Sequence, residues 1–237
     1  MERRESEPDP INQGPCESAE LQGLKYVAQH TPVPKVHRTY SIDGRLYIEM
    51  EYIHGVTLQE LWTSHSLSPT EKQAIVKQVA ACINELRLLK PPQEGVVASA
   101  ELGRVDDARV GYRSFGPFGN INDFHSFLRG PIPLKDCTKV LSESVPQCHT
   151  RQYRTYFTHA DLCPRNIIIR DDKIAAIVDW QFAGWYPEYW EYTKAHYGLL
   201  NIPDWYSEFK NAVPRYDDEL ATERALWAQL DQPGTWQ

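Results

Sequence analysis

The sequence has few of the features that would indicate a membrane protein, a disulfide-stabilised scaffold or a nucleic-acid-binding protein. No apolar run approaches the roughly 20 residues that a membrane-spanning helix needs. Residues 1–7 lack the apolar core of a signal peptide, so we expect a cytoplasmic protein without a membrane partner. The 5 cysteines form no Cys-x-x-Cys pair, which indicates neither a disulfide framework nor a zinc site. A net charge of -7 argues against nucleic acid as the main partner.

What is present is the composition of an ordinary globular protein. The chain has 237 residues, of which 41% are hydrophobic and 24% are charged. A chain of this length can bury a sizeable core, either as one domain or as two lobes. No internal repeat divides it.

One stretch carries most of the chemical information. It has the form His159-x-Asp161-x-x-x-x-Asn166 and is followed by two apolar runs, residues 167–169 and 174–178, which end at Asp179. Apolar runs of this length around a charged turn predict a buried hairpin, because each run suits a short strand. Such a hairpin would bring Asp179 back beside Asn166.

That arrangement suits phosphoryl transfer, in which catalysis is mainly positioning and charge neutralisation. One aspartate, here Asp161, would orient the acceptor hydroxyl, while Asn166 and Asp179 would hold Mg²⁺ against the nucleotide phosphates. His159 would order the loop by hydrogen bonding. The alternative for each isolated aspartate is an ordinary loop residue that caps a turn. Cys163 lies within the same motif, but no neighbour indicates an activated thiolate.

Two blocks, residues 159–166 and 178–192, resemble the aminoglycoside phosphotransferase-like family, especially its fungal members. A weaker resemblance extends from Glu20 to about residue 205. It implies an α+β, protein-kinase-like fold with a reduced antiparallel small lobe and a mostly helical large lobe. It also implies transfer of phosphate from ATP, with Mg²⁺, to a hydroxyl of a small molecule.

The resemblance assigns further roles around this motif. Glu20 corresponds to the helix glutamate that pairs with a strand lysine, although a solvent-facing position in a first helical turn is equally compatible with the pattern. The backbone carbonyl of Glu51 and the backbone amide of Ile53 would face adenine. Arg165 would contact Asp161 or a phosphate, with surface exposure as the alternative.

Local patterns divide the chain into three parts: a disordered tail at 1–17, a truncated small lobe and hinge at 18–54, and the large lobe at 55–237. Ser18 is a candidate N-cap for the first helix, and Asp43-Gly44 predicts a hairpin. Ser68-Pro69 predicts the start of a long helix, since it combines an N-cap with a first-turn proline. Residues 91–120 are predicted to be irregular, and the aromatic residues at 180–192 are predicted to pack in the core.

The sequence also departs from the family pattern at its start. A glycine-rich phosphate loop and a strand lysine are expected before the Asp43-Gly44 turn, yet that segment holds only two glycines, Gly14 and Gly23, and no lysine in a strand pattern. The first three strands of the small lobe are therefore expected to be missing. Three explanations stay open: a truncated form of an active kinase, a pseudokinase that binds nucleotide or a partner, or an enzyme with a substitute lysine.

The substrate is not identified by the sequence. Amino sugars, choline-like alcohols, homoserine-like acids and other metabolites all carry a suitable hydroxyl. Acidic residues near the C-terminal end, including Asp217 and Asp218, weakly favour a cationic acceptor, although most of these carboxylates are expected to lie on solvated helix faces.

Overall fold

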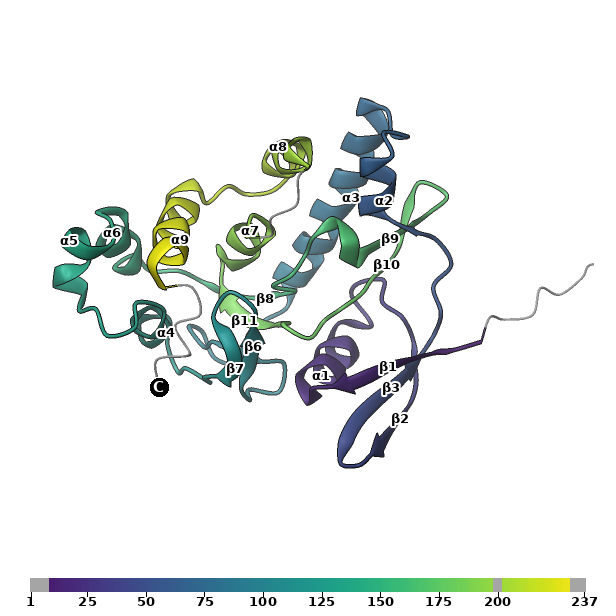
Figure 1. The fold of residues 1–237 in the computed structure, drawn as a ribbon, viewed down its shortest axis with the longest axis horizontal. Helices are drawn as coiled ribbons and strands as arrows, with labels where there is room; N and C mark the ends of the chain where they lie inside the picture. The colour runs from purple at the N-terminus through teal and green to yellow at the C-terminus, as the bar shows by residue number, and fades with distance from the viewer. Residues whose placement is uncertain (1–8, 198–201, 231–237) are drawn as a thin grey trace, which may run out of the picture.

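The computed structural model describes residues 9–197 and 202–230. It is a mixed α+β protein in which a small antiparallel sheet and a first helix lie beside a larger, mostly helical part (Figure 1). Within the described residues, none of the helices combines the length and the apolar character that a membrane span requires.

The small sheet has three strands in the order β1-β3-β2, with β1 at Ile11–Cys16, β2 at Val36–Ile42 and β3 at Arg45–Met50. The hairpin between β2 and β3 is as predicted, because Asp43 and Gly44 adopt the positive φ angles of 50° and 75° that a tight turn requires. The prediction of a disordered tail at 1–17 is wrong for Ile11–Cys16. Its first eight residues lie outside the described part of the chain.

Strand β1 also changes the expected content of the small lobe. It pairs antiparallel with β3, on the edge opposite β2, so one of the strands expected to be missing is present. Helix α1 (Ser18–Val27) follows directly and buries Leu24 and Val27 in the core. The predicted N-cap is one residue off, since Ser18 is the first helical residue and Glu17 holds the cap position without a side-chain hydrogen bond.

The long helix begins and ends close to the prediction. Helix α3 spans Pro69–Leu88, and Ser68 and Glu71 form a reciprocal capping box at its start. Its buried stripe includes Ile75, Val79 and Ile83, at the spacing of one helical face. The short elements β4 (Val56–Thr57) and α2 (Leu58–Thr63) connect the small sheet to α3.

The predicted central hairpin is present as β9 (Ile167–Arg170) and β10 (Lys173–Ile177). Its turn residues Asp171 and Asp172 both have positive φ, and β4 pairs with the other edge of β9. A second sheet has the order β5-β11-β8, with β5 at Ala98–Ser99, β11 at Gly184–Pro187 and β8 at Thr155–Thr158.

The predicted irregular segment at 91–120 is only partly irregular. It contains β5 and a two-stranded ladder of β6 (Val105–Asp107) and β7 (Gly111–Phe115). Such short strands are difficult to predict because their pairing partners, and not their own sequence pattern, determine them.

Of the remaining described helices, α4 (Ile121–Leu128), α5 (Cys137–Val140), α6 (Ser144–His149) and α9 (Asp217–Leu230) lie at the end of the molecule farthest from the small sheet (Figure 1). The others are η1 (Leu134–Asp136), α7 (Trp190–Ala195), α8 (Pro203–Ala212) and η2 (Pro164–Asn166), of which η2 directly precedes β9 and lies within the His159–Asn166 motif. The aromatic residues Trp180, Trp185, Tyr186, Tyr189 and Trp190 are all buried, as expected for core packing.

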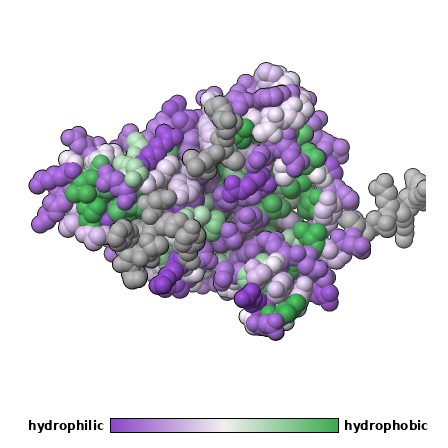
Figure 2. All heavy atoms as spheres, in the orientation of Figure 1, coloured by the Kyte–Doolittle hydropathy of each residue, from purple (hydrophilic) through white to green (hydrophobic). Residues whose placement is uncertain are grey.

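The face shown in Figure 2 is mostly hydrophilic, and hydrophobic residues gather on its right side, over the central hairpin and the small sheet, and at its left end, over α5. Val56 and Tyr52, in the connection between these two elements, are among the exposed large hydrophobic residues of the described chain. The segment that joins the two parts of the molecule therefore carries apolar surface.

Candidate active site

The loop that follows β8 is held by His159, which is fully buried. The backbone N–H of Asp161 donates to Nδ1 of His159 at 3.1 Å, so the ring proton lies on Nε2, which donates to the Val178 carbonyl at 3.0 Å. Burial lowers the pKa of His159 to about 4 and keeps the ring neutral. His159 therefore ties the loop to the end of β10, as expected for a residue that orders the loop.

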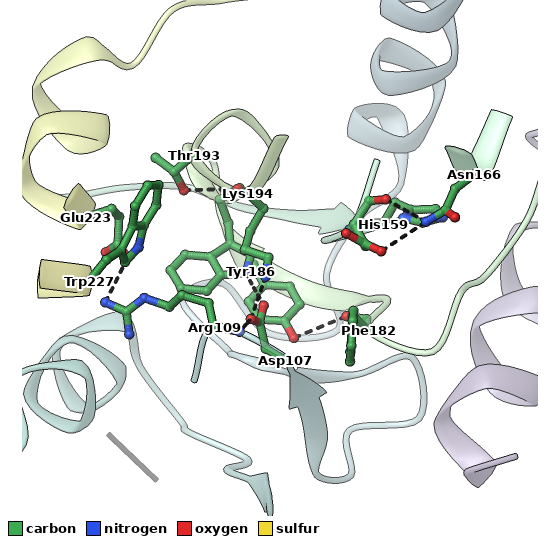
Figure 3. Close-up of polar contacts among 12 residues, drawn as sticks. Asp107, Arg109, His159, Asn166, Phe182, Tyr186, Thr193, Lys194, Glu223 and Trp227 are labelled. Atoms are coloured by element: carbon green, nitrogen blue, oxygen red, sulfur yellow. Dashed lines mark hydrogen bonds and ion pairs between the residues drawn. The ribbon is translucent and has the colours of Figure 1, made fainter. Parts of the chain in front are cut away.

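Asp161 and Asn166 lie in direct contact (Figure 3, Asn166 labelled). Asn166 donates from Nδ2 to the Asp161 carbonyl at 2.9 Å and to Asp161 Oδ2 at 3.0 Å, and Arg165 donates to the same Oδ2 at 2.5 Å. Arg165 thus contacts the aspartate, as one of its two predicted alternatives has it, and its side chain is also 47% exposed, as the other has it. Both donors use one carboxylate oxygen, which leaves Oδ1 of Asp161 without a hydrogen bond from the described residues.

Asp179 follows β10 and lies at the end of the hairpin near Asn166. The backbone N–H of Val178 donates to the Asn166 carbonyl at 3.0 Å, which closes the hairpin at this end. Burial raises the pKa of the Asp179 carboxyl, the charge of Asp161 raises it further, and Arg165 opposes both effects. The hairpin therefore brings Val178, the neighbour of Asp179, against Asn166, and the carboxylates of Asp161 and Asp179 repel each other.

Two backbone torsions in this region are unusual for residues with a side chain. Ala160 has φ of 63° and Asp179 has φ of 66°, in the left-handed region that favours glycine. Such conformations cost about 1–3 kcal/mol each and persist where the surrounding structure enforces them. Ala160 directly precedes Asp161, and Asp179 is itself a candidate site residue, so both unusual torsions lie in the candidate site and neither lies in the hairpin turn.

The donor set fits a hard divalent cation. The Asn166 amide uses its nitrogen for Asp161, so its oxygen faces away from that bond, and Asp179 adds an anionic oxygen. Mg²⁺ typically takes one or two carboxylate or amide ligands from the protein and keeps water or phosphate oxygens for the rest. Within the described residues no set of three His, Cys, Asp or Glu side chains is arranged to hold a metal, which distinguishes this centre from a zinc-type site.

Cys163 is buried in the same loop. Burial raises the pKa of its thiol to about 12, so the group is protonated at neutral pH. This agrees with the expectation that it is not an activated thiolate.

Glu191, in α7, hydrogen bonds to the backbone of the loop at His159, and the sequence analysis did not predict this role. Its Oε2 accepts the backbone N–H of His159 at 2.7 Å, and its carboxyl also interacts with the backbone N–H of Ala160. Burial raises the pKa of Glu191 to about 7, although both backbone donors favour the charged form. The only available signal was its place in segment 178–192, one of the two blocks that carry the family resemblance.

Helix α7 is itself fixed by a buried ion pair that the sequence analysis did not anticipate. Lys194 Nζ lies 2.6 Å from Asp107 Oδ1, and Trp190 Nε1 donates to Asp107 Oδ2 at 3.2 Å (Figure 3). Arg109 pairs with Glu223 at 3.1 Å, again with both side chains buried. Asp107 in β6 therefore anchors the helix that presents Glu191 to the loop.

Glu20 is buried at 3% exposure in the first turn of α1, so the solvent-facing alternative is excluded. Burial raises the pKa of its carboxyl, and the nearby charge of Asp179 adds to this effect. The strand residue that meets Glu20 is Gln13, whose Nε2 donates to Glu20 Oε1 at 2.5 Å. The helix glutamate thus lies close to Asp179, but its strand partner is an amide.

The predicted adenine-facing backbone lies just after β3. The backbone N–H of Glu51 donates to the Lys35 carbonyl at 2.8 Å, whereas within the described chain neither the Glu51 carbonyl nor the Ile53 amide bonds to another backbone group. These two groups are thus available to a ligand, as adenine recognition by backbone would require. The structure brings Asp161, Asn166, Asp179 and Glu20 into one region. The Glu51 carbonyl and the Ile53 amide lie in the connection between β3 and β4.

The acidic C-terminal residues are not simply solvated. Asp218 and Glu219 both pair with Arg151 at 2.9 Å, and Asp217 pairs with Arg215. Glu219 and Glu223 are buried. Asp217 and Asp218 are exposed, as expected for solvated helix faces, whereas Glu219 and Glu223 are not. Because Asp217 and Asp218 pair with arginines, the charge available to a cationic acceptor is smaller than the sequence indicates.

The fold and the site together define a protein-kinase-like protein of the α+β class. Residues 17–231 match the sequence model of the phosphotransferase enzyme family, APH, and the chain belongs to this family. No relative was found among curated proteins.

Several solved structures of aminoglycoside phosphotransferases are similar in fold. A thermostable APH(4)-Ia mutant in a ternary complex with AMP-PNP and hygromycin B has a TM-score of 0.65 at 15% identity, covering 99% of this chain and 90% of that one. APH(2")-IIIa with GDP and kanamycin has a TM-score of 0.61 at 16% identity, covering 95% and 78%. APH(3'')-Id from Streptomyces rimosus with ADP and streptomycin has a TM-score of 0.54 at 16% identity, covering 93% and 82%. At these identities the similarity establishes the fold.

Proposed function

We propose that this chain binds Mg²⁺-ATP and transfers a phosphoryl group to a hydroxyl of a small molecule. The observation that carries the proposal is the convergence of Asp161, Asn166 and Asp179 at the end of one hairpin. In this proposal β1–β3 and α1 form a reduced small lobe, residues 55–237 form the large lobe, and the connection at Glu51 and Ile53 meets adenine.

Asn166 and Asp179 would hold the metal ion. Bound Mg²⁺-ATP would supply the phosphoryl group, and its Mg²⁺ would neutralise the charge of the phosphates. Asp161 orients the acceptor hydroxyl. Its Oδ2 is held by Arg165 and Asn166, so Oδ1 is the atom left to accept the hydroxyl proton. The contacts of His159 and Glu191 with the loop backbone fix the position of that oxygen.

The substrate is proposed only as a class. The similar structures hold hygromycin B, streptomycin or kanamycin, which supports a polyhydroxylated, amine-bearing acceptor. Asp217 and Asp218, which favoured a cationic acceptor, already pair with arginines, so the preference does not rest on their charge.

A second candidate is a binding protein of this family without turnover. The observation that favours it is the amide Gln13 beside Glu20, where an active kinase carries a lysine. Nucleotide binding would then persist while phosphoryl transfer would be weak or absent.

The test compares three isosteric variants, Asp161→Asn, Asp179→Asn and Asp172→Asn as the matched control in the exposed hairpin turn. Titration calorimetry with Mg²⁺-ATP measures affinity, and phosphate transfer is followed with a panel of aminoglycosides, amino alcohols and sugars. We expect Asp161→Asn to abolish transfer and spare affinity, because this carboxylate faces the acceptor. We expect Asp179→Asn to weaken Mg²⁺-dependent affinity, because it removes an anionic ligand.

The control variant should resemble the wild type in both measurements. Binding without transfer to any acceptor would favour the second candidate. Equal losses of nucleotide affinity in the two site variants would show that the roles of Asp161 and Asp179 are wrongly assigned.

A further inference from the structure

Strand β1 presents Gln13 toward the interior of the small lobe. In the β1–β3 ladder Gln13 lies opposite Ile48, which is fully buried, whereas its neighbour Asn12 lies opposite Glu49 on the other face. Asn12 accepts a hydrogen bond from Tyr40 at an exposed position. The alternation of side chains along a strand therefore directs Gln13, and not Asn12, toward α1 and the candidate site.

Gln13 is one of two neutral donors to a buried carboxylate. Its Nε2 donates to Oε1 of Glu20, and the thiol of Cys16, at the end of the same strand, also donates to Glu20. Burial, followed by the charge of Glu20, raises the pKa of Cys16 to about 12, so this second donor is a thiol and carries no charge. Within residues 9–197 and 202–230, no lysine or arginine forms an ion pair with Glu20.

The position of this pair matters because Glu20 lies near Asp179, the proposed metal ligand. In protein kinases the strand residue that pairs with the helix glutamate is a lysine, and it contacts the nucleotide phosphates. We propose that Gln13 is a phosphate-binding residue of this site and takes the place of that lysine with an uncharged amide. One N–H of its Nε2 holds Glu20, and the second N–H is left for a phosphate oxygen.

This inference rests on the proposed function and goes beyond it. An amide can hydrogen bond to a phosphate but cannot neutralise it, so the site binds nucleotide with less charge compensation than a lysine would give. The nucleotide affinity of this chain is therefore limited by one position in β1, and restoring the cation there should increase it.

The experiment measures Mg²⁺-ADP and Mg²⁺-AMP-PNP binding by calorimetry in Gln13→Lys, Gln13→Met and Asn12→Lys. Gln13→Lys should tighten binding at least about tenfold, equivalent to about 1.4 kcal/mol. Asn12→Lys adds the same charge to the same strand on the opposite face and should change affinity less than about twofold, since exposed charges are screened. Gln13→Met keeps the length of the side chain but removes its N–H groups, and should weaken binding about threefold or more.

Pairing with Glu20 can be tested in the same assay. Adding Glu20→Gln to Gln13→Lys should remove most of the gain, because the lysine then loses the carboxylate that orients it. Thermal unfolding of every variant verifies the fold. If Gln13→Lys does not fold, the loss of affinity in Gln13→Met carries the test.

The outcomes separate this inference from the proposed function. If the wild type binds nucleotide but Gln13→Lys binds no more tightly, or Asn12→Lys gains as much as Gln13→Lys, the role of Gln13 is refuted and the proposed function stands. Unchanged affinity in Gln13→Met would also refute it. If no variant binds nucleotide, both proposals fall.

Discussion

Replacing Glu191 by glutamine should remove a large part of the pH dependence of stability. Glu191 is buried behind the loop that carries His159 and Asp161, and it accepts the backbone N–H of His159 at 2.7 Å. Burial raises the pKa of its carboxyl from 4.5 to about 7 in the folded protein. The folded state therefore binds a proton more tightly than the unfolded state does. The resulting stabilisation is fully present below pH 4.5 and is lost as the pH rises through about 7.

The magnitude follows from the two pKa values. A difference of about 2.5 between 4.5 and about 7, at about 1.36 kcal/mol for each pKa unit, gives about 3 kcal/mol, because the buried side chain has no solvent to screen it. Most of this loss falls between pH 5 and pH 8. Burial lowers the pKa values of His159 and His125 to about 4. Their contribution to the pH dependence of stability is the same in the wild type and in Glu191→Gln, so it cancels when the two proteins are compared.

The assay is urea unfolding of the wild type and Glu191→Gln at pH 5 and pH 8. Between these two pH values the free energy of unfolding should fall by roughly 2–3 kcal/mol more in the wild type than in the variant. Glutamine keeps an oxygen that can accept the His159 N–H, so the loop should remain in place. Glu191→Ala is the contrasting variant, and it should cost about 1–3 kcal/mol at both pH values because it leaves a buried amide without an acceptor. Parallel pH profiles for the wild type and Glu191→Gln would refute the reasoning.

Three further variants test other parts of the structure. Lys194→Met should cost about 3–5 kcal/mol in urea unfolding, because it leaves the buried Asp107 charge without its cation; a loss below 1 kcal/mol would contradict a buried ion pair. Arg165→Ala should lower transfer activity in a steady-state assay while changing stability by less than about 1 kcal/mol, since Arg165 is about half exposed and orients Asp161; unchanged turnover would exclude that role. Ser68→Ala should lower the stability by about 1 kcal/mol, because it removes the capping box of α3. An unchanged melting temperature would show that the capping box does not stabilise the protein.

The parts of the fold that were predicted correctly depend on neighbours in the sequence. The central hairpin follows from two apolar runs and a turn whose residues Asp171 and Asp172 tolerate positive φ. The start of α3 follows from the capping box at Ser68, which needs only a span of four residues. Because the hairpin fixes Asp179 relative to Asn166, the centre of the candidate site could also be predicted from local sequence.

The parts that were missed depend on contacts between distant residues. Strand β1 contains a glycine and a proline and lacks strand periodicity, and it is a strand because β3 supplies its hydrogen-bond partners. Glu191 and Lys194 are charged residues that sequence patterns assign to a surface, but each is buried with a partner that lies 32 or 87 positions away. No local pattern contains those partners.

The charges around the candidate site show why strand β1 matters to the function. Three carboxylates, those of Asp161, Asp179 and Glu20, lie in one region, and Arg165 is bonded to the first of them. The other two both have a raised pKa, because burial and mutual repulsion outweigh the charge of Arg165 at Asp179 and the neutral donors Gln13 and Cys16 at Glu20. A divalent ion at Asp179 would relieve one of these charges, whereas Glu20 depends on the residue opposite it in β1. In the proposed function the loop and the hairpin would position the reacting groups, and we expect the amide of Gln13 to determine how tightly the chain binds nucleotide.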